Sequence, residues 1–276
     1  MTRKLPTVAD LLGRKGQRQH TMLKVFTLEE ASAAEAAGID IVSVGPDLML
    51  HAGYRAAAPT LFSMTGKSHL EAGTADDYLR WACAAMLAGA DAIYCSGSLR
   101  TVEHLAREHI PVVGHVGLVP SRATWTGGFR AVGKTAAEAM ALLDEVRAYE
   151  AAGAFAVEIE VVPALVATEI SRRVGILLWS MGAGAGCDAQ YLFANDLLGY
   201  TEGHVPRHSR AYRNFAAENA RLQAERIAAF TEFGADTASG AYPEHKHLVQ
   251  MTEDEHARFL TMVDTATDAN PAPTPD

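Results

Sequence analysis

Helix-like apolar spacing alternates with short, almost continuous apolar runs along the first two thirds of the chain. Helices are expected after Thr27, Thr74 and Thr135, because each threonine precedes an acidic residue by three positions, a spacing typical of helix N-caps. Each of these helices leads through a glycine into an apolar run with the length of a buried strand. The expected strands cover residues 39–44, 90–95, 111–116, 154–160 and 176–181, with further helices over 99–108 and 163–173.

This alternation predicts a parallel sheet in which all strand C-termini face one end. Residues with reactive or polar side chains gather at those ends, together with one glycine run: Asp47, residues 94–96, His115, Glu160 and residues 182–186. Because these groups come from many strands rather than from one crevice, the pattern favours a (β/α)8 barrel over an open sheet. Residues 53–73 have no full helix pattern, and a strand pattern is present there only near 59–64.

Beyond Gly186 the alternation stops. Residues 187–198 indicate a short helix, and residues 213–233 indicate one long amphipathic helix. From Thr265 the chain is rich in Pro, Ala, Thr and Asp, a composition typical of disorder. We therefore expect one domain over residues 1–264, a barrel with a C-terminal helical extension, and a disordered tail over residues 265–276.

Composition restricts the class of protein. The 276 residues are 49% hydrophobic and 21% charged, as in ordinary globular proteins. A net charge of −9 without a Lys/Arg block argues against a nucleic-acid partner. No apolar run reaches membrane-spanning length, no signal-peptide core is present, and the three cysteines lack paired or metal-type spacing. We expect a cytoplasmic protein that binds neither nucleic acid nor membrane.

The stretch PVVGHVGLVPSRATWTGGFRAVGKT, residues 111–135, is the strongest candidate for a functional loop. An apolar strand carries His115 into a long glycine-rich loop that holds Arg122 and Arg130. Barrels usually present an active site in this way. The alternative is a surface loop with one satisfied histidine, although loops of this length are usually functional or disordered.

Several blocks in the same order resemble the ketopantoate hydroxymethyltransferase family, of the phosphoenolpyruvate mutase-like barrel superfamily. The resemblance runs from about Val8 to Met251. Five family patterns carry it: GHxGLxPQ…GGxxVQG+T at residues 114–135, EAGIDxxxVG at 36–45, EEAGAFAxVLExVP at 150–163, GIGAGxxxDGQVLVxxDxLG at 181–199, and a closing P…EHSFHM echoed by Pro243, Glu244, His245 and Met251.

The resemblance implies an activity and a set of site residues. In the family a divalent metal, Mg²⁺, chelates a 2-oxoacid, a carboxylate removes the proton on C3, and the enolate attacks a one-carbon unit carried by 5,10-methylenetetrahydrofolate. The base maps onto Glu160, and the family histidine maps onto His115, which would orient the substrate. A salt bridge at the strand end is the alternative role for Glu160. The resemblance further implies a small 2-oxoacid-like substrate, a homo-oligomer and substrate contacts from Ser43, Gly45, Asp47, Tyr94, Ser96, Arg122, Arg130 and Met181.

The charged half of the family site is different in this sequence. The first ligand aspartate of the family falls on Pro46, with Asp47, the candidate metal ligand, one place along. The second family ligand falls near Ser63, and a family Lys and Glu fall on Tyr94 and Ser96.

Three hypotheses follow from this difference. The chain keeps one-carbon transfer with a rearranged metal site that draws on Asp47, His51, His69 or Glu71. Alternatively it is a metal-independent aldolase or carbon–carbon lyase, in which His115, Tyr94 and Ser96 donate hydrogen bonds to an enolate. Finally, it has lost catalysis and serves as a binding or structural subunit.

Other residues suggest chemistry on weaker patterns. Cys95 is either a nucleophile or a small buried hydrophobe. The glycine run at 182–186 either cradles a phosphate or pteridine tail or forms a tight turn. Lys24 is a possible Schiff-base lysine. The pairs His204/His208 and His245/His247 have spacings that a metal can use, and surface histidines are the alternative.

Overall fold

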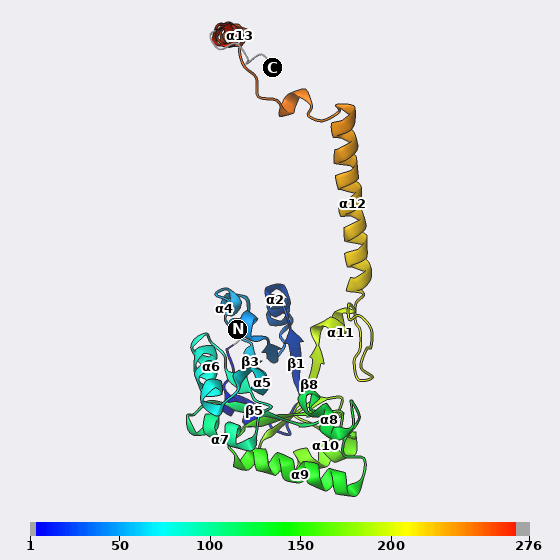
Figure 1. Cartoon of the computed structure of the whole chain (residues 1–276). Coiled ribbons are helices and arrows are strands. Elements are labelled where there is room, and N and C mark those ends of the chain that lie inside the picture. The colour runs from blue at the N-terminus through cyan, green and yellow to red at the C-terminus, as the bar shows by residue number, and fades with distance from the viewer. Residues whose placement is uncertain (1–3, 269–276) are drawn as a thin grey trace, which may run out of the picture. The chain divides into compact units, whose positions relative to one another are not determined.

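The computed structural model describes residues 4–268 and closes eight parallel strands into a barrel (Figure 1). Each strand pairs with its sequence neighbour, and β1 pairs with β8 to close the ring. The predicted (β/α)8 barrel with C-terminal helices is confirmed. The strands are β1 (His20–Val25), β2 (Ile41–Val44), β3 (Phe62–Gly66), β4 (Ala92–Tyr94), β5 (Val112–Gly117), β6 (Ala156–Glu160), β7 (Leu177–Met181) and β8 (Ala189–Phe193).

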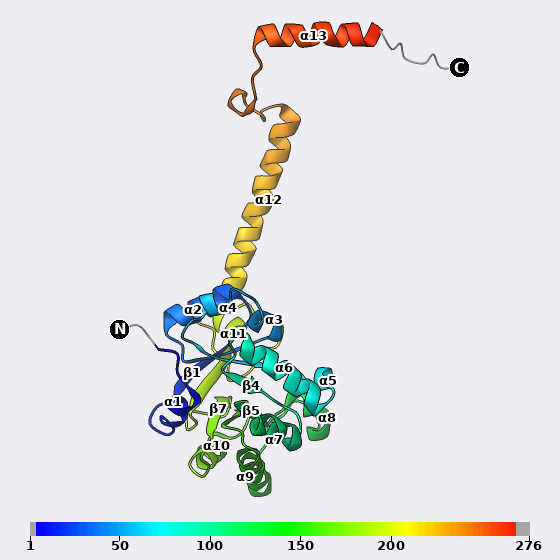
Figure 2. The same ribbon diagram turned by 90° about the vertical axis from the view of Figure 1, so that its left-hand side faces the viewer.

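Helices cover the outside of this ring, as two views of the barrel show (Figures 1 and 2). The predicted caps are confirmed, because the hydroxyls of Thr27, Thr74 and Thr135 each accept a hydrogen bond from the N–H three residues on. These threonines begin α2 (Leu28–Ala37), α6 (Ala75–Leu87) and α9 (Ala136–Ala151). The remaining barrel helices are α1 (Val8–Leu12), α3 (Pro46–Met49), α4 (Tyr54–Ala57), α5 (His69–Ala72), α7 (Leu99–Arg107), η1 (Pro120–Arg122), α8 (Ala123–Thr126), α10 (Ala164–Ser171) and α11 (Ala194–Leu198).

The structure corrects the expectation for residues 187–198. These residues contain strand β8, and only the short helix α11 follows it. Buried Ala189 and Tyr191 alternate with exposed Gln190, which is the period of a strand and not of a helix. The strand pattern near 59–64 corresponds to β3, which begins at Phe62 and lies between two four-residue helices.

Inward-facing side chains change character from one end of the barrel to the other. At the N-terminal end they form an apolar cluster that includes Met22, Ile41, Phe62, Ala92, Val113, Ala156, Leu177, Trp179 and Ala189. Side chains two residues apart on a strand point the same way. The next inward positions on five of these strands are therefore polar: Lys24, Ser43, Tyr94, His115 and Glu158. The core thus ends in a polar layer at the C-terminal mouth.

Asp188, directly before β8, fastens the N-terminal end of the barrel. Its buried carboxylate accepts hydrogen bonds from the Lys15 ammonium at 2.8 Å and from the Leu178 amide at 2.8 Å. It also accepts from the Gly16 amide at 3.2 Å and from the Ser171 hydroxyl at 3.3 Å. One side chain therefore joins β7, β8 and the loop after α1 at the end opposite the polar layer.

The chain divides into two compact units at Ala216. The second unit holds most of α12 (Phe215–Ser239), then η2 (His245–His247) and α13 (Glu253–Asp268). Residues 265–268 of the expected tail end α13, and residues 269–276 lie outside the described residues. The single domain over 1–264 stays a prediction. None of the helices in the described part of the chain has the length and apolar character that crossing a membrane requires.

Replacing Asp188 with alanine should destabilise the barrel by about 3 kcal/mol, because a half-buried ammonium partner and two amides lose their acceptor. The free energy of unfolding in urea measures this change. Asp144→Ala is the matched control, since the contact of Asp144 to Arg147 at 3.8 Å is exposed and its loss should cost less than about 0.5 kcal/mol. Equal losses in the two variants would contradict the anchoring role of Asp188.

Candidate active site

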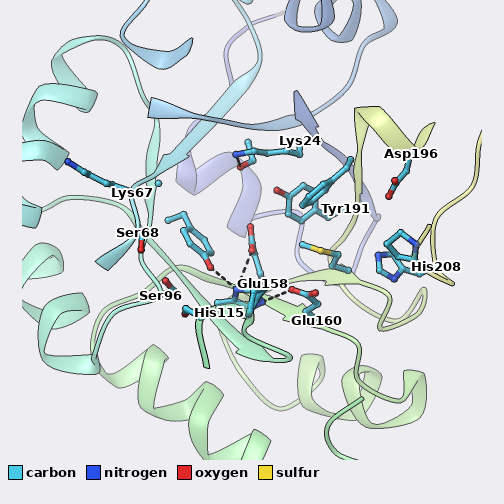
Figure 3. Close-up of a pocket in the computed structure, with 18 residues that line it drawn as sticks. Lys24, Lys67, Ser68, Ser96, His115, Glu158, Glu160, Tyr191, Asp196 and His208 are labelled. Atoms are coloured by element: carbon cyan, nitrogen blue, oxygen red, sulfur yellow. Dashed lines mark hydrogen bonds and ion pairs between the residues drawn. The ribbon is translucent and has the colours of Figure 1, made fainter. Parts of the chain in front are cut away.

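A cavity of about 470 Å³ lies at the C-terminal mouth of the barrel (Figure 3). Its volume suits a small molecule. Strand ends from most of the ring supply its walls, as expected for a barrel active site. The lining includes Lys24, Ser43, Gly66, Lys67, Ser68, Tyr94, Ser96, His115, Ser121, Glu158, Glu160, Met181, Tyr191, Phe193, Asp196 and His208.

His115 is the centre of the polar layer. Its Nε2 lies 3.0 Å from Oε2 of Glu160, and its Nδ1 lies 2.7 Å from the Tyr94 hydroxyl and 3.8 Å from Oε2 of Glu158 (Figure 3). The imidazole is 2% exposed. Strand register explains the cluster, because β5 pairs with β6 so that His115 stands beside Glu158 and Gly117 beside Glu160.

Tyr94 and His115 share a hydrogen bond of 2.7 Å between the phenol oxygen and Nδ1. Burial, and then the neighbouring Glu158 carboxyl, raise the pKa of Tyr94, so the phenol keeps its proton. In the tautomer in which this hydroxyl donates to Nδ1, the imidazole proton lies on Nε2. Nε2 is buried and faces Glu160, yet it has no hydrogen bond of good geometry within the described part of the chain. That tautomer therefore has an N–H donor without an acceptor beside Glu160.

Glu158 is a buried carboxyl between two groups that bear or can bear positive charge. Its residue is 4% exposed, and burial raises its pKa to about 7, with Glu160 adding to the rise and His115 and Lys24 opposing it. A carboxyl with this pKa exchanges its proton near neutral pH, as an acid–base group must. Glu158 and Glu160 point into one cavity because they lie two residues apart on β6.

Lys24 enters the cavity from β1, opposite β6 (Figure 3). Its ammonium lies 3.4 Å from the Ser43 hydroxyl on the neighbouring strand. Burial lowers the pKa of Lys24, and the Glu158 carboxylate partly restores it. The cavity thus contains a cationic group on one side and a cluster of carboxyls on the other.

The structure places the expected site residues in two groups. Residues that line the cavity are Glu160, His115, Ser43, Tyr94, Ser96 and Met181. The others do not line it: Gly45 caps α3, Asp47 is exposed in the first turn of that helix, and Arg130 bonds the Thr126 and Ala131 carbonyls. Their roles in substrate binding stay predictions.

Arg122 supports the cavity wall from behind. Its guanidinium lies 3.0 Å from Glu145 and 3.4 Å from the carbonyl of Ser96 and from the Tyr149 hydroxyl. The Tyr149 ring fits against Gly114, where any side chain would overlap it. The glycine before His115 therefore allows α9 to pack closely on the site strand.

Sequence reasoning gave no role to several lining residues, among them Glu158, Tyr191 and Asp196, and it considered His208 only as part of a metal-type histidine pair. The signal for Glu158 was present, because it precedes Glu160 by two positions on a strand. Asp196 accepts hydrogen bonds from Thr201 and Ser209, each at 2.5 Å, and so shapes the loop that carries His208. Such a contact between the short helix α11 and a later loop leaves no pattern in the sequence.

The described residues do not form a ligand set for the metal that the family resemblance implies. Within residues 4–268, no three His, Cys, Asp or Glu side chains come together in a way that holds a metal ion. Asp47 and Glu71 are exposed on separate short helices, and Nδ1 of His51 accepts from the Gly53 amide at 3.0 Å. The side chain of His69 lies outside the described ones. We therefore derive no step through a metal.

The structure also bears on two weaker candidates, Cys95 and the glycine run at 182–186. Cys95 is buried, and burial raises the pKa of its thiol, which opposes nucleophilic use. The glycine run at 182–186 forms the connection from β7 to β8, where a Cβ on Gly184 would meet Ala164 of α10 at 2.5 Å. Close packing on α10 accounts for that glycine.

Comparisons with known proteins agree with the resemblance seen in the sequence. A family model described as ketopantoate hydroxymethyltransferase matches residues 71–245. A 3-methyl-2-oxobutanoate hydroxymethyltransferase of Oleidesulfovibrio alaskensis is 32% identical, covering 95% of this chain and 96% of that protein. One of Halalkalibacterium halodurans is 31% identical, covering 91% and 96%.

Among solved structures, a 2,3-dimethylmalate lyase of the PEP mutase/isocitrate lyase superfamily is similar with a TM-score of 0.51. It is 14% identical and covers 96% of this chain and 100% of that chain. At this identity the likeness shows the barrel fold alone.

Glu158 should make the stability of the protein depend on pH. Between about pH 4.5 and 7 the unfolded chain releases this proton while the folded chain retains it, so stability falls as pH rises, by on the order of 3 kcal/mol in all. Glu158→Gln should remove this fall in stability, so towards pH 8 the variant should become more stable relative to the wild type. Urea unfolding from pH 4.5 to 8 measures it.

Glu108→Gln is the matched control, because Glu108 is exposed at the end of α7. Its pH profile should follow that of the wild type. A Glu158→Gln profile with the wild-type slope would show that Glu158 ionises as an ordinary carboxyl.

Proposed function

This chain belongs to the ketopantoate hydroxymethyltransferase family, and from that premise we propose that it removes a proton from C3 of a 2-oxoacid and joins the resulting carbanion to a one-carbon unit. The observation that carries the proposal is the contact between His115 and Glu160 at 3.0 Å inside the cavity. It puts a carboxylate base next to a hydrogen-bond donor. Proton abstraction beside a carbonyl needs both.

In this proposal Glu160 is the base. Its carboxylate lies at the end of β6 and its side chain is 13% exposed, so it reaches the cavity while bulk water is largely kept from it. Removing the C3 proton moves negative charge onto the oxygen of the C2 carbonyl. His115, through its Nε2 proton, supports that charge, while the Tyr94 hydroxyl donates to Nδ1 and holds the imidazole in place. A well-placed donor in a dry site contributes about 3 kcal/mol.

The one-carbon unit comes from a donor such as 5,10-methylenetetrahydrofolate, the carrier that the family resemblance implies. The names of the curated relatives, as hydroxymethyltransferases, agree with transfer of a one-carbon unit. Water releases the methylene carbon from the two folate nitrogens as formaldehyde, which leaves tetrahydrofolate. The C3 carbanion attacks the formaldehyde carbon, a carbon–carbon bond forms, and the aldehyde oxygen takes up a proton to become the hydroxyl of the product. The site residues that support this proposal are Glu160, His115, Ser43, Tyr94, Ser96 and Met181. A homo-oligomer in the cytoplasm remains our expectation.

A second candidate is a metal-independent aldolase or carbon–carbon lyase on a related 2-oxo substrate. The Lys24 ammonium favours it, because this cation lies in the same cavity as the Tyr94 and His115 donors. Positive charge and neutral donors together can support an enolate.

Glu160→Gln should slow exchange of the C3 proton of 2-oxoisovalerate for deuterium, on the order of 100-fold or more. Loss of the C3 proton signal by NMR in D2O measures the rate. Glu108→Gln should exchange as the wild type does. Undiminished exchange in Glu160→Gln would remove Glu160 as the base, and a wild-type protein that neither exchanges nor binds the 2-oxoacid would favour a non-catalytic role.

A chelator tests whether C3 exchange depends on a metal. Both candidates expect the rate of C3 exchange to stay unchanged when EDTA is added to dialysed protein. A rate that falls on chelation and returns with added Mg²⁺ would instead support one-carbon transfer with a rearranged metal site. Zinc or calcium added in place of Mg²⁺ tests whether the recovery is specific.

A further inference from the structure

Lys24 is placed as a nucleophile and not as a structural cation. Among residues 4–268, no carboxylate oxygen lies within 4.0 Å of its ammonium nitrogen, and the hydroxyl of Ser43 at 3.4 Å is a weak, neutral contact. The lysines that serve structure differ: Lys15 contacts Asp188 at 2.8 Å, and Lys246 contacts Glu244 at 2.9 Å. The nitrogen of Lys24 is left free to meet a ligand in the cavity.

The groups around Lys24 are those that imine formation requires. Figure 3 shows Lys24 and Glu158 entering the cavity from opposite sides, with Tyr191 of the neighbouring strand β8 beside Lys24. The other lysine of the cavity wall, Lys67, points away from this space (Figure 3). One amine and one buried carboxyl therefore share the space that a 2-oxoacid would occupy.

We propose that Lys24 forms an imine with the C2 carbonyl of the 2-oxoacid, so that the carbanion at C3 is stabilised covalently as an enamine. The inference rests on the proposed function, because it names the electron acceptor for the same C3 deprotonation. In this imine-based mechanism the group that accepts the electron pair from C3 is the imine of Lys24 and not an external electrophile.

The steps balance without any further reagent. The uncharged amine of Lys24 attacks C2, the carbonyl oxygen takes up a proton, and the nitrogen loses one, which gives a carbinolamine. Glu158 in its acid form protonates the hydroxyl, which leaves as water while the C=N bond forms. Glu160 then removes the C3 proton, and the electron pair moves through the C2–C3 bond to the iminium nitrogen. After C3 has bonded to the carbon electrophile, water restores the C2 carbonyl and frees Lys24.

The protonation states of the two groups support this sequence. Burial lowers the pKa of Lys24, which increases the fraction of uncharged amine. Burial raises the pKa of Glu158 to about 7, so near neutral pH a substantial fraction of it is the acid that the departing hydroxyl needs. The two shifts run in opposite directions at one cavity, as an amine nucleophile and its acid partner require.

Borohydride trapping tests the inference directly. Wild-type protein is incubated with 2-oxoisovalerate, reduced with sodium borohydride and digested for peptide mass spectrometry. The expected product is a secondary amine on Lys24, with a mass increase equal to the 2-oxoacid less one oxygen atom. The sequence contains six lysines, so the modified residue can be assigned without ambiguity.

Variants separate covalent from purely electrostatic use of the lysine. Lys24→Arg keeps the positive charge but forms no imine, and C3 exchange should fall on the order of 100-fold. Lys134→Met, at an exposed position outside the cavity, should trap the adduct as the wild type does. Circular dichroism and the unfolding midpoint confirm that each variant is folded.

Each outcome of these experiments either supports or overturns the imine on Lys24. Wild-type protein that exchanges C3 deuterium without any adduct overturns the imine and leaves the proposed function intact. An adduct on Lys67 likewise overturns the role of Lys24. C3 exchange at the wild-type rate in Lys24→Arg also overturns it, and indicates that the positive charge at this position pairs with the substrate carboxylate. Absence of both adduct and exchange removes the proposed function together with the inference.

Discussion

Closure of eight parallel strands is the constraint on which the rest of this structure depends. In a closed ring every second side chain must enter the interior, so each strand contributes to both the core and the mouth. Met22 is followed two positions later by Lys24, and Ala156 by Glu158. The same register that buries the apolar members therefore brings the polar ones together, although they are 134 residues apart in sequence.

The polar layer places ionisable groups where water is scarce. Burial penalises the charged forms of Lys24 and Glu158, and each partly relieves the penalty of the other. His115 adds a third member through its contacts with Tyr94 and Glu160. Such groups are costly for stability, and burial of this kind with a specific partner is typical of functional sites.

Most of the barrel was predictable from the sequence, whereas only part of the cavity was. Helices with an N-cap threonine and a closing glycine gave clear signals, as at Thr27 and Gly38. β8 was missed because it is five residues long and only half buried, so its apolar content resembles that of a short helix. His115 and Glu160 were found through family patterns. Lys24 was considered as a Schiff-base lysine on a weak pattern only, because its position in one cavity with Glu158 depends on which strands meet across the ring. This is a tertiary property that no local spacing encodes.

Asp188 and the polar layer lie at opposite ends of one barrel, and this separation bears on how the protein can change over evolutionary time. The N-terminal end closes through Asp188 and its partners Lys15 and Leu178, none of which enters the cavity. Substitutions at the mouth therefore leave the closing contacts untouched. A lineage can exchange one set of charged residues for another while the scaffold stays folded, which makes the reaction far easier to alter than the architecture.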